Sequence, residues 1–322
     1  MIVPAYNAGD TLDACLSALR SQTVASTAYE IIVVDDGSTD RTPQIARSHG
    51  VCLIQQPNAG PAAARNRGAQ QAQGEILLFT DADCAPAEDW VAQMVAPFAD
   101  PSIAGARGIY RTRQRSLVAR FVQLEYESRY ARLQGGQEID FVDTYSAGYR
   151  RSLWAESGGF DETFRTASVE DQEFSFRLVR AGHRLVFVPE AVVYHQHDRT
   201  LFEYWRRKFG IGYGKARILG RYPERVVSDS HTPQALKAQI VFLGLGLLSL
   251  LLSIGWVPAR WVLLVSSLFF LLAATPLLVR IARDDPLVLV VAPVLLVVRA
   301  LALGSGLCLG MLVPARKAKA SR

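Results

Sequence analysis

Three long apolar runs near the C-terminus constrain this 322-residue chain more than any other feature. They cover residues 238–256, 261–279 and 286–313, and a helix needs roughly 20 apolar residues to cross the hydrocarbon core of a bilayer. Consecutive runs of this length without a polar face are hard to cover with protein inside a soluble core. We therefore expect a membrane anchor of about three transmembrane helices rather than buried helices of a soluble domain.

Basic residues around these runs indicate an orientation. Positive charges gather on the cytoplasmic side of membrane helices, and they lie here before the first run and between the second and third. They are Arg217, Arg221, Arg225, Lys237, Arg280 and Arg283. This pattern favours an integral membrane protein whose front domain faces the cytoplasm, with membrane lipids as partners.

The third run conflicts in part with this orientation. Three spans would place the basic tail, 314–322, on the far side of the membrane, against the positive-inside tendency. The run also contains Pro293 and Arg299. A kinked, re-entrant or interfacial segment therefore stays open as an alternative to a full span, and we expect Arg299 to face partner helices or a lipid phosphate.

The front of the chain fits a cytoplasmic location. Met1 opens directly into "MIVPAYN", without a basic-then-apolar leader. Cys15, Cys52, Cys84 and Cys308 have neither pairing nor metal spacing, so we expect free thiols in a reducing compartment. The net charge of +5 suits anionic lipid headgroups better than nucleic acid, because no nucleic-acid-binding motif accompanies it.

The first third of the chain alternates short apolar runs with helical patterns. Strands are predicted within 1–6, 29–38, 51–56 and 75–83, and helices within 8–22, 42–50 and 60–74. Alternation of this kind predicts an α/β fold with a mostly parallel sheet, helices on both faces, and ligands at the carboxyl ends of the strands. We expect Ile2 and Val3 to form a short, frayed edge strand, and 105–120 to be a mobile basic segment.

Two aspartates end one of the predicted strands. In "LLFTDADC", Asp81 and Asp83 are two residues apart, so in an extended segment both carboxylates point to one side and can bind one cation. Mg²⁺ and Mn²⁺ prefer carboxylates together with phosphate oxygens and water. A pair of this kind taken alone is more often a turn or a cap.

A second acidic pair ends a neighbouring strand. Asp35 and Asp36 close "IIVVDD", and because adjacent carboxylates repel, a bound base or ribose explains them better than stability does. Arg65 and Arg67 follow on the next predicted helix. Arg67 suits a solvated surface, whereas Arg65 is close enough to the helix start to reach toward a nucleotide base or its phosphates.

The helix predicted in "VEDQEFSFRLVRAGH" begins with Glu170 and Asp171. Acidic residues at a helix N-terminus can serve only to stabilise the helix dipole. The alternative is a general base at the mouth of a donor site, where it takes a proton from an acceptor hydroxyl. The sequence alone leaves the two readings open.

Taken together and in this order, the motifs resemble the family-two inverting glycosyltransferases of GT-A fold. They are "VPAYN", "EIIVVDDGSTD", "AARNRGA", "LLFTDADC", "GGFDETF" and "VEDQEFSFRLVRAGH". The resemblance covers residue 1 to about 215, and it implies a nucleotide-sugar donor, Mg²⁺ or Mn²⁺, and transfer with inversion. The expected organisation is a GT-A domain over 1–215, a basic juxtamembrane linker over 216–237, transmembrane helices over 238–313 and a basic tail over 314–322.

The resemblance also assigns roles to individual residues. It implies that the nucleotide base is bound by Pro4, Ala5, Tyr6, Asp35, Asp36 and Arg65. It implies that Asp81 and Asp83 meet the ribose, the metal and the diphosphate. It also implies that Asp171, beside Glu170, is the catalytic base, and that Gly158, Gly159 and Phe160 form a turn at the sugar. Some related enzymes bind metal through a histidine near the position of His195, although a lone histidine such as His195 or His197 is more often structural.

One departure from the family bears on the product. Processive synthases carry a Gln-x-x-Arg-Trp signature, where this chain has "YWRRKFGIGYGKA". We therefore expect transfer of a single sugar. The expected donor is of UDP type, and the apolar runs suggest a lipid-linked or glycan acceptor at the bilayer. A sugar nucleotidyltransferase and a membrane-tethered nucleotide-sugar-binding protein without turnover remain the alternatives, the first disfavoured because "PAYNAGDT" lacks the expected basic, glycine-rich loop.

Overall fold

The computed structural model describes residues 1–133, 135–166, 169–226 and 232–313. The chain divides into two compact units. The α/β unit consists of Met1–Arg113 and Tyr130–Gln196, and the helical unit consists of Gln114–Arg129 and His197–Arg322. Each is described by itself below.

The α/β unit is built around one nine-stranded sheet. Its strands are β1 (Ile2–Ala5), β2 (Ile32–Asp35), β3 (Cys52–Gln55), β4 (Ile76–Phe79), β5 (Cys84–Pro86), β6 (Ile103–Arg111), β7 (Glu138–Ile139), β8 (Ala147–Arg150) and β9 (Arg184–His195). Its helices are α1 (Leu12–Arg20), α2 (Thr42–Ser48), α3 (Pro61–Gln71), α4 (Trp90–Val95), α6 (Arg151–Ser157) and α7 (Glu170–Arg180), with short 3₁₀ turns at Ser26–Ala28, Ala96–Ala99 and Thr144–Ser146.

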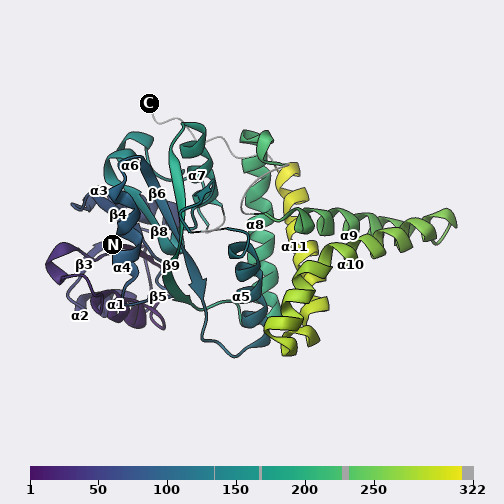
Figure 1. Ribbon diagram of the computed structural model, residues 1–322, viewed down its shortest axis with the longest axis horizontal. Helices are drawn as coiled ribbons and strands as arrows, with labels where there is room; N and C mark the ends of the chain where they lie inside the picture. The colour runs from purple at the N-terminus through teal and green to yellow at the C-terminus, as the bar shows by residue number, and fades with distance from the viewer. Residues whose placement is uncertain (134, 167–168, 227–231, 314–322) are drawn as a thin grey trace. The chain divides into compact units, whose positions relative to one another are not determined.

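The strand order is β3-β2-β1-β4-β8-β6-β9-β5, and β7 pairs with β9 (Figure 1). Strands β3, β2, β1 and β4 are parallel to one another, as expected for consecutive βαβ units. Beyond β4 the sheet is mixed, because β8 is antiparallel to both β4 and β6, and β9 is parallel to β6 but antiparallel to β5 and β7. The α/β fold is as predicted, and parallel pairing holds for the first four strands and for β6 with β9, whereas the other pairings are antiparallel.

Two segments expected to be poorly ordered contain strands that lie inside the sheet, paired with strands far away in the sequence. The short strand β1 lies inside the sheet, paired with β2 and β4, so it is not a frayed edge. The segment 105–120, expected to be mobile, begins within the interior strand β6, where Arg107 is buried, and ends within the helix that begins at Leu117. Arg107 forms an ion pair with Asp143 at 2.7 Å, and a partner distant in sequence cannot be read from the local pattern.

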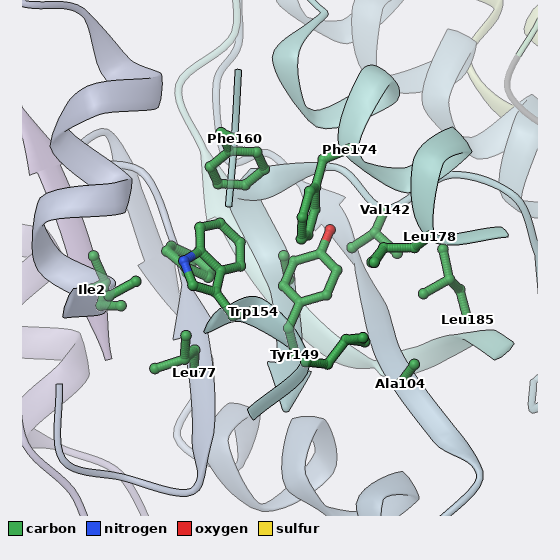
Figure 2. Packing of buried hydrophobic residues seen from close by; sticks show 14 of the residues in the cluster. Ile2, Leu77, Ala104, Val142, Tyr149, Trp154, Phe160, Phe174, Leu178 and Leu185 are labelled. Carbon is green, nitrogen blue, oxygen red and sulfur yellow. The ribbon is translucent and has the colours of Figure 1, made fainter. Parts of the chain in front are cut away.

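The core of the α/β unit lies on the sheet face covered by α3, α6 and α7. Its centre is an aromatic group in which Tyr149, Trp154, Phe160 and Phe174, labelled in Figure 2, pack together and Phe79 packs against Trp154. The rings meet edge-on or tilted, the arrangement that the ring quadrupole favours. On the opposite face, the region over Gly148 is filled by Leu78, Met94 and Phe98, so helical segments cover both faces as predicted.

The helical unit contains the apolar runs. Its elements are α5 (Leu117–Tyr130, whose last residue belongs to the α/β unit), α8 (Leu201–Arg221), α9 (Gln234–Leu252), α10 (Pro258–Asp284) and α11 (Ala292–Leu312), with 3₁₀ turns at Pro223–Val226 and Pro286–Val290. Among the described residues, α9, α10 and α11 are each long and apolar enough to cross a membrane. This finding agrees with the predicted anchor.

The structure locates the expected end of the front domain and two residues of the third apolar run. Residue 215 lies inside α8, so the expected end of the front domain falls within a continuous helix, and 227–231 and the basic tail, 314–322, lie outside the described residues. Pro293 occupies the first turn of α11, where proline is tolerated, and therefore does not kink that helix. Arg299 does face partner helices, because it is hydrogen-bonded to Glu125 of α5 and Gln239 of α9.

Candidate active site

The topology of the sheet brings the predicted residues to one end of it, where the parallel strands have their carboxyl ends. The parallel strands β1, β2 and β4 all end there, which places Ala5, Asp35 and the segment after Phe79 together. Strand β8 runs antiparallel to β4, so the residues that precede β8 lie at this same end of the sheet. Strand β6 is antiparallel to β8, and β9 is parallel to β6. His195, the last residue of β9, therefore lies at this end as well. Ligands of open α/β sheets bind at such an end.

Arg65 joins two parts of the predicted site that lie far apart in the sequence. Its Nη2 donates to Asp81 Oδ1 at 2.7 Å, and its Nη1 donates to Glu170 Oε1 at 2.8 Å. Arg65 and Glu170 are buried, and the guanidinium also lies 5.9 Å from the Phe160 ring centroid. Glu170 therefore does more than stabilise the start of α7, and Arg65 is engaged by carboxylates at the position where we predicted contact with the donor.

Asp171 is held beside this ion-pair network. Its Oδ1 accepts a hydrogen bond from the Gln172 amide at 2.8 Å, and its Oδ2 faces the Thr144 amide at 3.5 Å. Burial raises the pKa of Asp171 well above the ordinary aspartate value, and repulsion by Glu170 and Asp143 raises it further, against the opposing effect of Arg65. A carboxyl group with a raised pKa can accept a proton near neutral pH.

Sequence reasoning missed the polar residues behind Asp171. Arg107 of β6 pairs with Asp143, which immediately precedes the turn that carries the Thr144 amide. Behind them, Tyr130 donates to or accepts from Tyr145 at 2.8 Å, and its hydroxyl accepts a hydrogen bond from the Tyr110 amide. The available signal was one arginine inside the apolar run "IAGARGIY", because a charge inside a buried strand requires a partner.

Asp83 and His195 form a candidate metal centre. The His195 Nε2 lies 3.2 Å from Asp83 Oδ2, and ligand atoms of Asp83, Cys84 and His195 lie within 4.8 Å of one another. His195 is further fixed by Tyr110, whose ring centroid is 4.4 Å from that of the imidazole. The two residues are close enough to share one ion, and their roles as metal ligands stay a prediction. Asp81 is not in the group and is instead bonded to Arg65.

The chemistry of these donors suits a divalent cation of borderline to hard character. Carboxylate and imidazole together are common ligands of Mn²⁺, and carboxylate alone is the usual protein ligand of Mg²⁺. Burial, with repulsion from Asp83 and Asp81, raises the pKa of the Cys84 thiol well above its usual value. Mg²⁺ and Mn²⁺ prefer oxygen and nitrogen ligands to soft sulfur, so Asp83 and His195 fit such an ion better than Cys84 does.

Asp35 and Asp36 both have hydrogen-bond donors within the protein. Asp35 accepts from the Ser38 amide and the Gln55 side chain, each at 3.0 Å. Asp36 accepts from the side chain of Gln56 and the amides of Ala59 and Gly60, each at 2.8 Å. These carboxylates therefore need no ligand to explain them, contrary to expectation, and donor binding by either stays a prediction. Asp36 fixes the loop that leads into α3 and so helps to position Arg65.

The remaining predicted residues lie at the same end of the sheet or beside it. Pro4 and Ala5 end β1, and the Tyr6 side chain that follows is 54% exposed. Tyr6 is therefore open to a planar ligand, as its predicted contact with a base requires.

The glycine turn is fastened to α3. Asn66 donates to the Phe160 carbonyl and accepts from the Phe160 amide, both at 2.9 Å, and Arg177 donates to the Gly159 carbonyl at 2.6 Å. Gly159 has φ +69, and a Cβ there would meet Asn66 Oδ1. The turn is thus held by two polar side chains that sequence reasoning did not single out.

The profile described as glycosyl transferase family 2 matches residues 1–157. The matched stretch contains the acidic ends of β2 and β4 together with Arg65. Residues 1–157 form a glycosyl transferase family 2 domain. This confirms the resemblance seen in the motifs, and Asp171 and His195 lie beyond the matched stretch.

Two relatives match a longer part of the chain than the family model does. The pre-mycofactocin glycosyltransferase of Mycobacterium tuberculosis is 28% identical over 263 residues, covering 77% of this chain and 53% of that protein. Glycosyltransferase AglE of Haloferax volcanii is 28% identical over 236 residues, covering 68% of this chain and 73% of AglE. The chain therefore spans about half the length of the first relative and about three quarters of the second.

A solved structure shares the fold beyond the family 2 domain. The mannosyltransferase PcManGT from Pyrobaculum calidifontis, solved in complex with GDP-Man and Mn²⁺, matches 97% of this chain and 86% of its own, with a TM-score of 0.59 and 21% identity. Similarity at this level concerns the fold alone. It confirms the prediction of a GT-A type α/β fold that is followed by apolar helices.

Proposed function

We propose that this protein is a glycosyltransferase that moves one sugar from a nucleotide-sugar donor to a hydroxyl of a lipid-linked or membrane-proximal acceptor, with inversion and with a divalent cation. The observation that carries the proposal is the Arg65 bridge, which ties the donor-side Asp81 to Glu170 and so to the neighbouring Asp171. The family 2 domain and the relatives named as glycosyltransferases support the same class of reaction.

Asp171 would act as the general base. Its raised pKa lets the carboxylate take the proton of the acceptor hydroxyl as the hydroxyl oxygen attacks the anomeric carbon. The nucleotide diphosphate leaves from the opposite face of the sugar, so a single displacement of this kind inverts the anomeric configuration. Arg65 keeps the charge of Glu170 paired, which limits the repulsion that this neighbour exerts on the Asp171 carboxylate.

Asp83 and His195 would hold the divalent cation, and the donor set favours Mn²⁺ over Mg²⁺ because it includes an imidazole nitrogen. When bound, the ion would neutralise charge on the diphosphate leaving group. Tyr6, Asp35 and Asp36 would lie on the nucleoside side of the donor, which we propose to be of UDP type. Gly159, which is buried against Asn66, would hold the backbone turn that approaches the sugar.

The proposed acceptor class and orientation rest on the apolar helices. Three helices that are long enough to cross a membrane keep the site near the bilayer, where an acceptor hydroxyl on a lipid-linked molecule is at high local concentration. The basic residues before α9 and at the end of α10 favour the cytoplasm as the side on which donor is used.

The test uses the full chain, purified in lipid nanodiscs and incubated with a panel of UDP- and GDP-sugars and an extract of polyisoprenyl lipids. Release of nucleoside diphosphate that depends on the lipid extract and on Mn²⁺ is the expected result. Release of pyrophosphate from a sugar phosphate and a nucleoside triphosphate would instead identify a nucleotidyltransferase. Donor binding without release from any sugar would identify a binding protein.

Asp171→Asn assigns the base. The variant should bind the donor within about threefold of the unmodified chain and lose about 10²–10⁴ of the transfer rate, the usual contribution of a general base. Glu156→Gln is the matched control, because Glu156 is an exposed carboxylate on α6. Equal rates for Asp171→Asn and Glu156→Gln would exclude Asp171 as the base.

A further inference from the structure

The three apolar helices do not pack as three adjacent spans. Helices α9 and α10 pack against each other along their lengths and form a hairpin, whereas α11 packs mainly along α8. Figure 1 shows α9 and α10 extending together, with α11 beside α8 and running across the direction of the hairpin. Because a bilayer aligns its spanning helices, α11 and the hairpin are not all spans of one bundle in this arrangement.

The contact between α8 and α11 is too close to be incidental. No Cβ fits at Gly212, which lies against the Leu303 carbonyl, or at Gly306, which lies against the Phe209 carbonyl. Gly310 lies against the Tyr213 carbonyl in the same way. One turn along each helix, Phe209 against Gly306 is followed by Tyr213 against Gly310, so α8 and α11 are parallel partners over about two turns, with their backbones in contact.

A buried ion-pair cluster fixes the middle of α11. Glu125 of α5 accepts from Arg299 at 2.6 Å, and from Lys208 and Tyr204 of α8 at 3.0 Å each. Arg299 also donates to Gln239 of α9 at 2.6 Å. All of these side chains are buried. Since one carboxylate pairs with cations from both α8 and α11, moving α11 away from α8 would leave a buried charge without its partner.

The charge of α8 determines how deep in the membrane α11 can lie. Helix α8 carries six cationic residues among its 21, namely Arg206, Arg207, Lys208, Lys215, Arg217 and Arg221. Cations are strongly unfavourable in the hydrocarbon core, so α8 does not belong there. A helix that is packed along α8 and joined to it through Glu125 therefore stays at the same depth, outside the hydrocarbon core.

We propose that only α9 and α10 cross the bilayer, and that α11 lies flat at the membrane surface on α8, with its exposed apolar side chains against the lipid. The exposed large apolar side chains of α11 that are available for this contact are Val294, Val297, Leu309, Met311 and Leu312. Two crossings return the chain to the side from which α9 leaves. The basic C-terminal residues then lie on the same side as residues 1–196, which agrees with the positive-inside tendency that three crossings would violate.

Paired reporters test the number of crossings in the full chain. Green fluorescent protein, which is fluorescent in the cytoplasm, and alkaline phosphatase, which is active outside it, are placed ahead of Met1, after Gly255 in the turn between α9 and α10, or after Arg322. We expect the two terminal positions to report one side and Gly255 to report the other. Opposite sides for the two termini would establish an odd number of crossings and overturn the proposal, as would three positions on one side.

Substitutions test whether the Glu125–Arg299 pair holds α11 in place. Arg299→Leu removes the ion pair and makes α11 more apolar, so the fraction of chains whose C-terminal reporter lies on the opposite side should rise several-fold. Glu125→Gln breaks the same ion pair without changing α11. A smaller rise in this variant is expected, and no change in either variant would contradict the role of the pair.

Discussion

Replacing Arg65 by methionine should destabilise the α/β unit more than any single substitution on the surface of α3. Arg65 is 3% exposed and carries two charge-assisted hydrogen bonds, to Glu170 and Asp81. Methionine keeps most of the apolar stem of the side chain and removes the charge. The loss in the free energy of unfolding therefore depends on whether water can reach each carboxylate that loses its partner.

The two carboxylates are unequal. The Asp81 side chain is 28% exposed and can be rehydrated, whereas the Glu170 side chain is 4% exposed and stays in a low dielectric. Leaving a buried charge without its partner typically costs about 3–5 kcal/mol, so most of the expected loss in the free energy of unfolding comes from Glu170. The lost contact with the Phe160 ring adds roughly 0.5–1 kcal/mol.

Urea unfolding of the full chain in detergent, followed by tryptophan fluorescence, measures the effect, because Trp154 packs against Phe160 close to the site. The matched control is Arg67→Met, an exposed position two residues along the same helix, which should change stability by less than about 0.5 kcal/mol. Glu170→Gln in the Arg65→Met background should recover part of the loss. Equal stability of Arg65→Met and Arg67→Met, or no recovery in the double variant, would refute the reasoning.

Three further results are expected. The pKa of Asp171 is raised in the folded chain, so the transfer rate should fall on acidification well above pH 4, and a fall only near pH 4 would contradict the assignment. For the same reason Asp171→Asn should be more stable than the unmodified chain at pH 7.5. This advantage in stability is absent below the unfolded-state pKa of about 3.9. Gly159→Ala should cost more stability in thermal unfolding than Gly158→Ala, since both have positive φ but only Gly159 has Asn66 against its missing Cβ; equal costs would argue against a tight turn. In calorimetric titration, Asp83→Asn should weaken Mn²⁺ binding at least tenfold while Cys84→Ser leaves it unchanged, and the reverse order would place the metal on the thiol.

Local patterns predicted the elements whose signal is contained in one segment. The parallel strands β1 to β4, the helices between them and the apolar helices all lie within a few residues of the expected positions, because each buries a continuous or periodic apolar face. Strand β6 was missed because Arg107 and the neighbouring glycines interrupt its apolar pattern. Helix α8 was missed because charged and glycine residues hide its apolar face.

The candidate site divides in the same way. The sequence alone indicated carboxylates for a cation at the strand ends and a catalytic base at the start of α7. The pairing of Arg65 with Glu170, 105 positions away, could not be predicted, because it depends on how α7 packs against α3. The same holds for the Arg107–Asp143 pair behind Asp171 and for the imidazole of His195 beside Asp83.

By itself, the sequence determined that the chain has an α/β front part of family-two type and an apolar C-terminal part, since both follow from periodicity, motif order and run length. Only the tertiary structure decided that the second half of the sheet is mixed, that Arg65 is held between two carboxylates, and that α11 packs along a cationic helix. The physical reason is that hydrophobic pattern is a property of each segment. The burial of a charge, in contrast, depends on a partner that only the folded chain supplies.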